Sequence, residues 1–595
     1  MLYNDYARTG DLKSLNSHNT NPFDSTTKSK RVLIVTINRN FPPVSSIANG
    51  MTIVSDLTGA GYPFDIVNFE RFITMNFDDS NDHDVIFLNG HTSPVEVEKV
   101  ALKCKAAIHS GRKIFINGQL PYTQYDENGR QIRKVFFSKE LFDLKLCTSW
   151  GYGKATVPKL YEKDSYITCK GIILKRINTF LFQNPPQIKI TLGQYIIGFL
   201  TPNGGAIDGS SDYFLNLLDY GKVTGYLRYG HPGIVGFAND RINAKPIVSI
   251  EVHCDTTHNI NSINRLEEMA NQFQIPLSNL LVWSRSTDES NKRWNEASNN
   301  PLMLVGSHSR THPKFWQKVE NFYDETIGAL NDQRKSIPKT GNYFNFSGRM
   351  NPSMTQINEL FDSGTIFGAQ GSEPRMLGLP FNAPLKQFKD RPVWYFFWRV
   401  LNRIFPAKEI QLFPTSEIWF YALSQSSTTP FCLSQTLCMD LKAIRGNKNY
   451  CELIKKSFFK NIKYGLYSYG GIHDYAMDRK PQCQSQGTLL KNQIVEAISF
   501  LASQNAIFIP TETLIKRLWD FISGWIDYKT LPDNSLQITI NRKSSLANQV
   551  KIQSRNQHRP VAKGDCIIGQ TLIDNILYVD LKPEIQSTFM VKFEK

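Results

Sequence analysis

Short apolar runs alternate with segments of helical spacing along much of the chain. Apolar runs at 31–37, 64–70, 84–90 and 112–118 predict strands, with helices between them over about 44–58 and 95–110. This alternation is typical of parallel strands joined by crossover helices. We therefore expect a flavodoxin-like or Rossmann-like α/β layer in the first part of the chain.

A second alternating series begins near Lys245. Strands are predicted at 246–255, 280–284, 302–309, 342–348, 463–475 and 506–512, with helices over about 262–273, 317–334 and 487–503. This series predicts a (β/α) barrel. From about residue 530, alternating runs predict a small β-domain. The predicted organisation is a mobile polar tail at 1–30, α/β domains at 31–245 and 246–525, and a β-domain at 526–595.

Composition and charge narrow the class of protein. The chain has 595 residues, 41% of them hydrophobic and 20% charged, so disorder over most of its length is excluded. It contains no apolar stretch of about 18 residues and no secretory leader pattern. We therefore expect a cytoplasmic protein, and a peripheral position at the inner membrane face is the second localisation that fits. The net charge of +15 favours an anionic partner. Without a helix-turn-helix or RNP motif, we expect no nucleic-acid partner.

The most informative motif follows the predicted strand at 302–309. His308 and His312 are four residues apart, and Asp255 ends the first strand of the same series. Two histidines and one carboxylate can hold a zinc ion and leave a position open for water, whose pKa zinc lowers to about 7. The alternative is a pair of surface histidines that flank a turn.

The run at 308–312, His-Ser-Arg-Thr-His, resembles the second motif of the polysaccharide deacetylase family, also called the NodB-homology or carbohydrate esterase 4 group. The resemblance implies that Asp255, His308 and His312 bind the metal. The family places a base Asp next to the metal-binding Asp, and Cys254 stands at that position here. Divergent members use Asp-x-Asp, which puts His253 at the base position, where strand alternation points it to the same side as Asp255. The alternative for His253 is a packed histidine.

Two further residues are implied by the same resemblance, which covers about 246–525. Arg349, in a run similar to the family's Arg-x-Pro motif, would contact a carboxylate or the substrate. His473 resembles the family's general acid, which protonates the leaving amine. The alternatives are an ordinary charge at the barrel rim for Arg349 and a buried structural histidine for His473.

The first predicted domain resembles the glutamine-amidotransferase-like domains attached to some carbohydrate enzymes. Active members carry a nucleophilic Cys after a strand like the one at 112–118, where this chain reads Asn117-Gly118-Gln119. The resemblance therefore implies a structural or binding role for 31–245.

The resemblances together imply a metal-dependent N-deacetylase that acts on an N-acetylated sugar of a glycan or glycan precursor, in surface polysaccharide biosynthesis. The alternative is a catalytically degenerate carbohydrate-binding or assembly protein. A segment at 391–406 carries Trp, Phe and Arg at helical spacing. It fits either an interfacial membrane contact, suited to a nucleotide- or lipid-linked substrate, or a helix packed within the protein.

Overall fold

The structure is a computed structural model of the whole chain. It describes residues 31–36, 59, 61–76, 83–89, 113–117, 122–125, 131–135, 166–168, 188–192, 195–199, 233–313, 316–347, 362–369, 450–463, 465–477, 487–542, 548–554 and 558–594, with a few isolated positions. The predicted tail at 1–30, Arg349 and the segment 391–406 lie outside the described residues. Among the described helices, none has the length and apolar character needed to cross a membrane.

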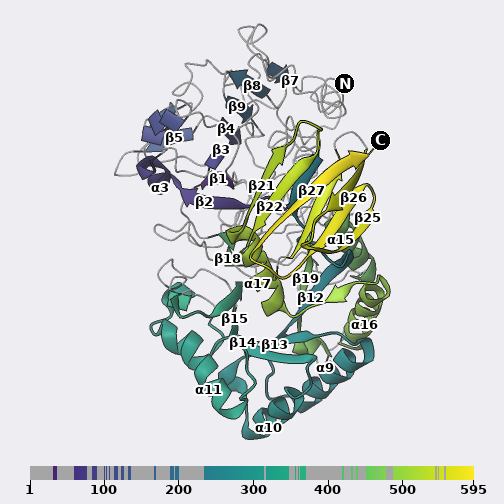
Figure 1. Cartoon of the computed structure of the whole chain (residues 1–595). Helices are drawn as coiled ribbons and strands as arrows, with labels where there is room; N and C mark the ends of the chain where they lie inside the picture. Colours follow the sequence, from purple (N-terminus) through teal and green to yellow (C-terminus); the bar gives the residue numbers. More distant parts are fainter. Residues whose placement is uncertain are drawn as a thin grey trace, which may run out of the picture.

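The protein is a mixed α/β protein built around one eight-stranded sheet that curls into a half-barrel (Figure 1). Its strands are β11 (Arg241–Ile242), β12 (Lys245–Cys254), β13 (Leu277–Leu281), β14 (Met303–Ser307), β15 (Tyr343–Phe346), β16 (Ile366–Ala369), β19 (Ser468–His473) and β20 (Ile507–Phe508). β12 pairs in parallel with β13 and β19 on its two sides, and its first residues also pair in parallel with β20. This places the first strand of the series at the centre of the sheet.

Helices cover the convex side of this sheet. They include α9 (Ile260–Phe273), α10 (Asp288–Ala297), α11 (Ala329–Ser336), α15 (Tyr450–Lys463) and α16 (Gly487–Ser503). α9 begins where the Asn259 side chain accepts a hydrogen bond from the Ser262 amide, and α10 begins with a capping box at Thr287. Such caps satisfy amides that have no partner inside the helix. These caps fix the first residues of α9 and α10, which lie a few residues after β12 and β13 in the chain.

The two faces of β12 carry different side chains. Val248, Ile250, Val252 and Cys254 belong to a buried apolar cluster that includes residues of α9 and α16. Ser249, Glu251 and His253 alternate with them and are also buried. Successive side chains of a strand point to opposite faces, so a column of polar groups lines the inside of the half-barrel.

Two four-stranded antiparallel sheets lie beside the half-barrel (Figure 1). One contains β10 (Gly233–Phe237), β23 (Gln549–Ser554), β26 (Ile576–Leu581) and β25 (Ile567–Ile573), and the other β21 (Trp525–Thr530), β22 (Leu536–Asn541), β27 (Gln586–Glu594) and β24 (Arg559–Lys563). Helix α17 (Thr511–Ser523) contributes Leu514, Leu518 and Phe521 to an apolar cluster shared with both sheets. β10 lies within the predicted domain 31–245 yet pairs with β23 near the end of the chain.

The first part of the chain contains a parallel sheet of order β2-β1-β3-β4. Its strands are β1 (Arg31–Thr36), β2 (Phe64–Asn68), β3 (His83–Asn89) and β4 (Lys113–Asn117), close to the four strands predicted there. The comparison of this region with flavodoxin-like or amidotransferase-like domains stays a prediction. The sheet region joins the rest of the molecule at Gly61, whose carbonyl accepts a 2.8 Å hydrogen bond from the Phe237 amide.

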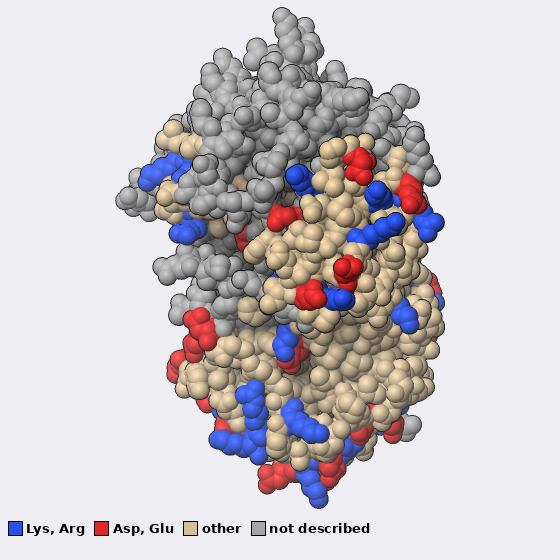
Figure 2. Space-filling model, viewed as in Figure 1, with Lys and Arg blue, Asp and Glu red and all other residues tan. Residues whose placement is uncertain are grey.

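The described surface mixes charges of both signs. Figure 2 shows Lys and Arg interspersed with Asp and Glu on the face in view, rather than gathered by sign. The net charge of +15 therefore does not form one basic patch on the described part of this face.

Candidate metal centre

Three strands bring the candidate residues to one end of the half-barrel. Asp255 directly follows β12, His308 directly follows β14, and His473 is the last residue of β19. In the sheet His253 pairs with His473, and β13 lies between β12 and β14. The carboxyl ends of parallel strands meet at one edge, which is where α/β proteins place their ligand sites.

Asp255, His308 and His312 form a group that could hold a metal ion. Their ligand atoms all lie within 4.8 Å of one another. The Nε2 atom of His312 is 3.2 Å from one Asp255 carboxylate oxygen, and the Nε2 atom of His473 is 3.9 Å from the other. The structure thus brings together the three ligands predicted from the sequence.

The loop after β14 holds His312 in an uncommon backbone conformation. Ser309 has φ +84° and His312 has φ +64°, a region that non-glycine residues seldom adopt and that costs about 1–3 kcal/mol. The Ser309 hydroxyl accepts a hydrogen bond from the His312 amide at 3.0 Å. The Ser309 carbonyl accepts another from the Trp283 amide at 3.0 Å. These bonds keep His312 turned toward Asp255.

A backbone contact sets the orientation of the His308 ring. Its Nδ1 atom is 3.0 Å from the Asn345 carbonyl oxygen. A carbonyl can only accept, so Nδ1 carries the proton and Nε2 carries the lone pair. Burial, and then the charges of His253 and His312, lower the pKa of His308 well below its usual range. The ring is therefore neutral, as a metal ligand must be.

The Asp255 carboxylate is held in its charged form. Burial alone would raise its pKa, but the His312 hydrogen bond and the electrostatic influence of the surrounding imidazoles of His308, His473 and His312 lower the pKa well below its usual range. The Arg285 guanidinium donates a 2.7 Å hydrogen bond to the Asp255 main-chain carbonyl. The site therefore offers one anionic oxygen ligand beside two imidazoles.

His253 lies next to the triad rather than in it. Its ring centroid is 4.6 Å from that of His308 and 5.1 Å from that of His473. Cys254 belongs to the apolar cluster beneath the helices. Burial, with the charges of Asp474 and Asp255, raises the pKa of its thiol well above the usual range. The structure thus places His253, and not Cys254, on the side of the proposed ligands.

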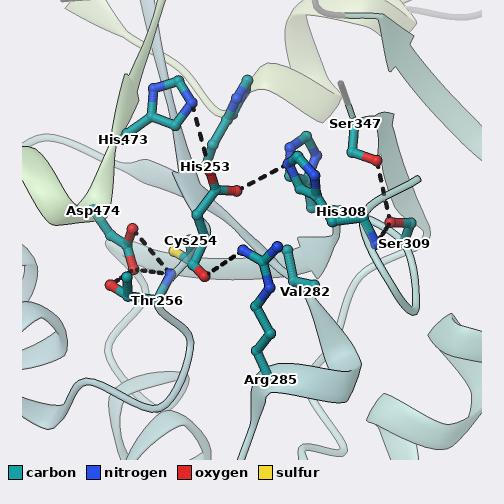
Figure 3. A network of polar contacts seen from close by, with 12 residues as sticks. His253, Cys254, Thr256, Val282, Arg285, His308, Ser309, Ser347, His473 and Asp474 are labelled. Atoms are coloured by element: carbon teal, nitrogen blue, oxygen red, sulfur yellow. Dashed lines mark hydrogen bonds and ion pairs between the residues drawn. The ribbon is translucent and has the colours of Figure 1, made fainter. Parts of the chain in front are cut away.

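His473 is followed by a buried carboxyl group. Asp474 accepts hydrogen bonds from the Thr256 amide at 3.0 Å and the Thr256 hydroxyl at 2.6 Å (Figure 3). Burial raises the pKa of Asp474 to about 7; the Thr256 hydrogen bonds oppose this rise and the Asp255 charge adds to it. Asp474 ties the end of β19 to the segment that follows Asp255.

Four residues around this site carry no sequence motif that predicts a role for them. Glu251, Tyr343 and Asn345 contact one another inside the half-barrel, and Asp474 lies at its rim. One sequence signal is Glu251 itself, a charged residue inside the predicted strand 246–255 and two positions before His253, because a buried carboxylate needs polar partners. Nothing in the sequence spacing identifies those partners, because they come from β15.

The donor set fits a divalent transition metal. Imidazole and carboxylate together are the ligands of zinc and related ions, and three protein ligands are typical of catalytic rather than structural sites. The ordered hydrogen bond from His308 to Asn345 supplies the outer contact that orients a ligating imidazole. With such an ion bound, the site could activate water and polarise an acyl carbonyl.

No protein-family model and no curated protein matches the sequence. Solved structures do resemble it. A peptidoglycan N-acetylglucosamine deacetylase is 10% identical, covers 46% of this chain and 90% of its own, and has a TM-score of 0.28. A family 4 acetyl xylan esterase from Clostridium thermocellum, in complex with a cobalt ion, is 9% identical, with 47% and 94% covered and a TM-score of 0.28.

A third similar structure is a mutant of a protein described as a family pseudoenzyme. It is 11% identical, covers 39% of this chain and 67% of its own, and has a TM-score of 0.19. At such low scores, any activity has to be argued from this chain's own residues. The solved structures that the chain resembles are polysaccharide deacetylases and esterases of carbohydrate esterase family 4.

Proposed function

We propose that this protein is a metal-dependent hydrolase that removes acetyl groups from an N-acetylated sugar. One observation carries the proposal: Asp255, His308 and His312 offer ligand atoms within 4.8 Å of one another, with two further imidazoles beside them. A metal ion held by three protein ligands, next to groups able to accept and donate protons, is an arrangement suited to amide hydrolysis.

Each residue has a role that its position supports. Asp255, His308 and His312 bind the cation, which would supply Lewis-acid activation of water and of the acyl carbonyl. His253 accepts the proton of the attacking water. His473, 3.9 Å from Asp255, donates a proton to the sugar nitrogen as acetate leaves. Arg349 lies outside the described residues, and its contact with substrate stays a prediction.

The test combines metal analysis with acetate release. We expect the wild-type chain to bind about one equivalent of zinc and to release acetate from N-acetylglucosamine oligosaccharides or N-acetylated sugar nucleotides. His308→Ala should lose both, because two ligands hold a divalent ion poorly. His558→Ala, which removes a histidine next to β24, is the matched control and should keep both. A metal-free wild type that stays folded and inactive when zinc is added would contradict the proposal.

A second candidate is a carbohydrate-binding or assembly protein with a degenerate site. The specific observation in its favour is Cys254, which stands where the family's base Asp is expected and packs among apolar side chains. This candidate predicts binding of N-acetylated oligosaccharides without acetate release, even in protein that retains its metal. Isothermal titration of the same oligosaccharides, run beside the acetate assay, separates the two.

The biological setting is a further part of the proposal. We place the reaction in the assembly of a surface polysaccharide, in the cytoplasm, on a nucleotide- or lipid-linked precursor. The net charge of +15 suits a substrate that carries phosphate. Comparison of free, nucleotide-linked and lipid-linked N-acetylated sugars in the acetate assay would test this choice.

A further inference from the structure

A fully buried carboxylate lies directly behind the proposed base. The Glu251 side chain is on the inner face of β12, two residues before His253, and neither side chain is exposed to solvent. The Nε2 atom of His253 is 2.5 Å from the Glu251 Oε1 atom. The pair belongs to the polar column inside the half-barrel, below the candidate metal centre.

Donors from β15 hold the same carboxylate. The Tyr343 hydroxyl donates to Oε2 of Glu251, and the Asn345 Nδ2 atom donates to Oε1 at 2.6 Å. Burial, and then the charge of Glu251, raise the pKa of Tyr343 and Tyr469 well above their usual range. Both phenols therefore stay protonated and remain available as donors, so the position of Glu251 is defined by groups outside its own strand.

The contact determines which nitrogen of His253 carries a proton. A carboxylate accepts hydrogen bonds, so the Nε2 atom of His253 must donate to Glu251. In a neutral imidazole the other nitrogen then carries the lone pair. Nδ1 is thus the basic nitrogen of a ring that lies between His308 and His473.

We propose that Glu251 is a positioning residue that holds His253 in the Nε2–H form, so that Nδ1 can accept the proton of the attacking water. This inference rests on the proposed function for its catalytic meaning. The proton passes from water to Nδ1, while the Nε2–H bond to Glu251 persists and stabilises the imidazolium that forms. The chain would thereby replace the missing carboxylate base with a histidine supported by a carboxylate.

The competing explanation is structural: Glu251 could serve only to satisfy buried donors from β15. The two explanations differ in what happens when the acceptor is removed or conserved. Glu251→Gln keeps a carbonyl oxygen that Asn345 and His253 can both reach, whereas Glu251→Leu removes every acceptor. Tyr343→Phe removes one donor to Glu251 and leaves the carboxylate–imidazole bond intact.

The experiment measures kcat and KM for acetate release, together with the ¹⁵N signals of histidine-labelled protein. His253→Ala identifies the His253 signals. In the wild type we expect a protonated Nε2 and an unprotonated Nδ1. Glu251→Leu should lower kcat by about 10²–10⁴ with KM changed less than about threefold, while zinc is retained. Glu251→Gln should keep the Nε2–H form and a higher kcat than Leu. Tyr343→Phe removes one of the groups that hold Glu251, so it should keep the Nε2–H form with a kcat between those of wild type and Glu251→Leu.

Two results would overturn the inference. One is a wild-type His253 protonated at Nδ1 alone. The other is a loss of kcat from Glu251→Leu that is as large in the His253→Ala background as in the wild type, since two residues that act through one group are not additive. If Glu251→Leu fails to fold, the wild-type and Gln spectra decide. If the wild type binds zinc but releases no acetate, the proposed function fails, and the ¹⁵N signals still test the contact.

Discussion

At the scale of single residues, the site depends on which protonation state each group can keep. Burial, together with neighbouring imidazoles, keeps His308 neutral, and the histidines around Asp255 keep its carboxylate charged. Asp474 differs, because burial raises its pKa to about 7. A carboxyl group with a raised pKa binds its proton more tightly in the folded protein than in the unfolded chain. The stabilisation that protonated Asp474 provides is fully present at pH values below its pKa in the unfolded chain. It is lost as the pH rises through about 7, the pKa of Asp474 in the folded protein.

This sign leads to a prediction for Asp474→Asn, which imitates the protonated carboxyl group. In protein stripped of metal by a chelator, the Tm of the variant relative to wild type should rise as the pH increases from about 4 to 8. The rise in the pKa of Asp474 from 3.8 to about 7 corresponds to a contribution of at most about 4 kcal/mol to the free energy of unfolding. Thermal unfolding followed by circular dichroism measures the difference. A difference that does not change with pH would show that Asp474 titrates normally.

At the scale of elements, the alternation of β12 decides which side chains reach the site. The strands and the two histidines after β14 could be predicted from the sequence, because apolar runs and short motifs depend only on residues that are close together in the chain. The partners of Glu251 could not, because Tyr343 lies 92 residues away. β13 and β14 lie between β12 and β15 in the sheet, and the side chains of β12 and β15 meet across the inside of the half-barrel. Spacing along the chain identifies the candidate metal ligands, but it does not identify the residues that support them.

The same alternation predicts the outcome of placing a carboxylate at position 254. Cys254→Asp should place a charge among Val252, Ile263 and Ile472 in the apolar cluster, which costs several kcal/mol without a partner. We expect lower Tm and no gain in acetate release. Cys254→Ser is the control for loss of the thiol. An active, stable Cys254→Asp protein would mean that position 254 faces the metal centre.

At the scale of the whole molecule, distant segments meet around α17. The Phe521 ring packs edge-on against Phe64 at 6.2 Å and Phe237 at 5.8 Å. Apolar periodicity predicted the strand that contains Phe64 and a β-domain after about residue 530. It did not predict that β10 would join the C-terminal sheets, because the sequence of a short strand does not specify its partner. Gly61 marks the junction: its φ is +72°, and an added Cβ would lie 1.9 Å from the Phe237 carbonyl oxygen.

Gly61→Ala therefore tests this junction. The substitution combines an unfavourable φ with a backbone clash, so we expect Tm to fall by several degrees. Gly364 is a matched control, because its φ is +71° and nothing lies within 4 Å of an added Cβ. Gly364→Ala should show the smaller loss that strain alone causes. Equal losses for the two variants would argue against close packing of Gly61 on β10.

The position of β12 at the centre of the sheet has a consequence for synthesis on the ribosome. β13 can pair with it early, but β19 and β20 come much later, and Ser249 meets Thr511 across 262 residues. At about 5–20 residues per second, one edge of β12 stays open for roughly 10–50 s after it emerges. A nascent chain of this protein should therefore be a good chaperone client, and its central strand the segment that needs shielding.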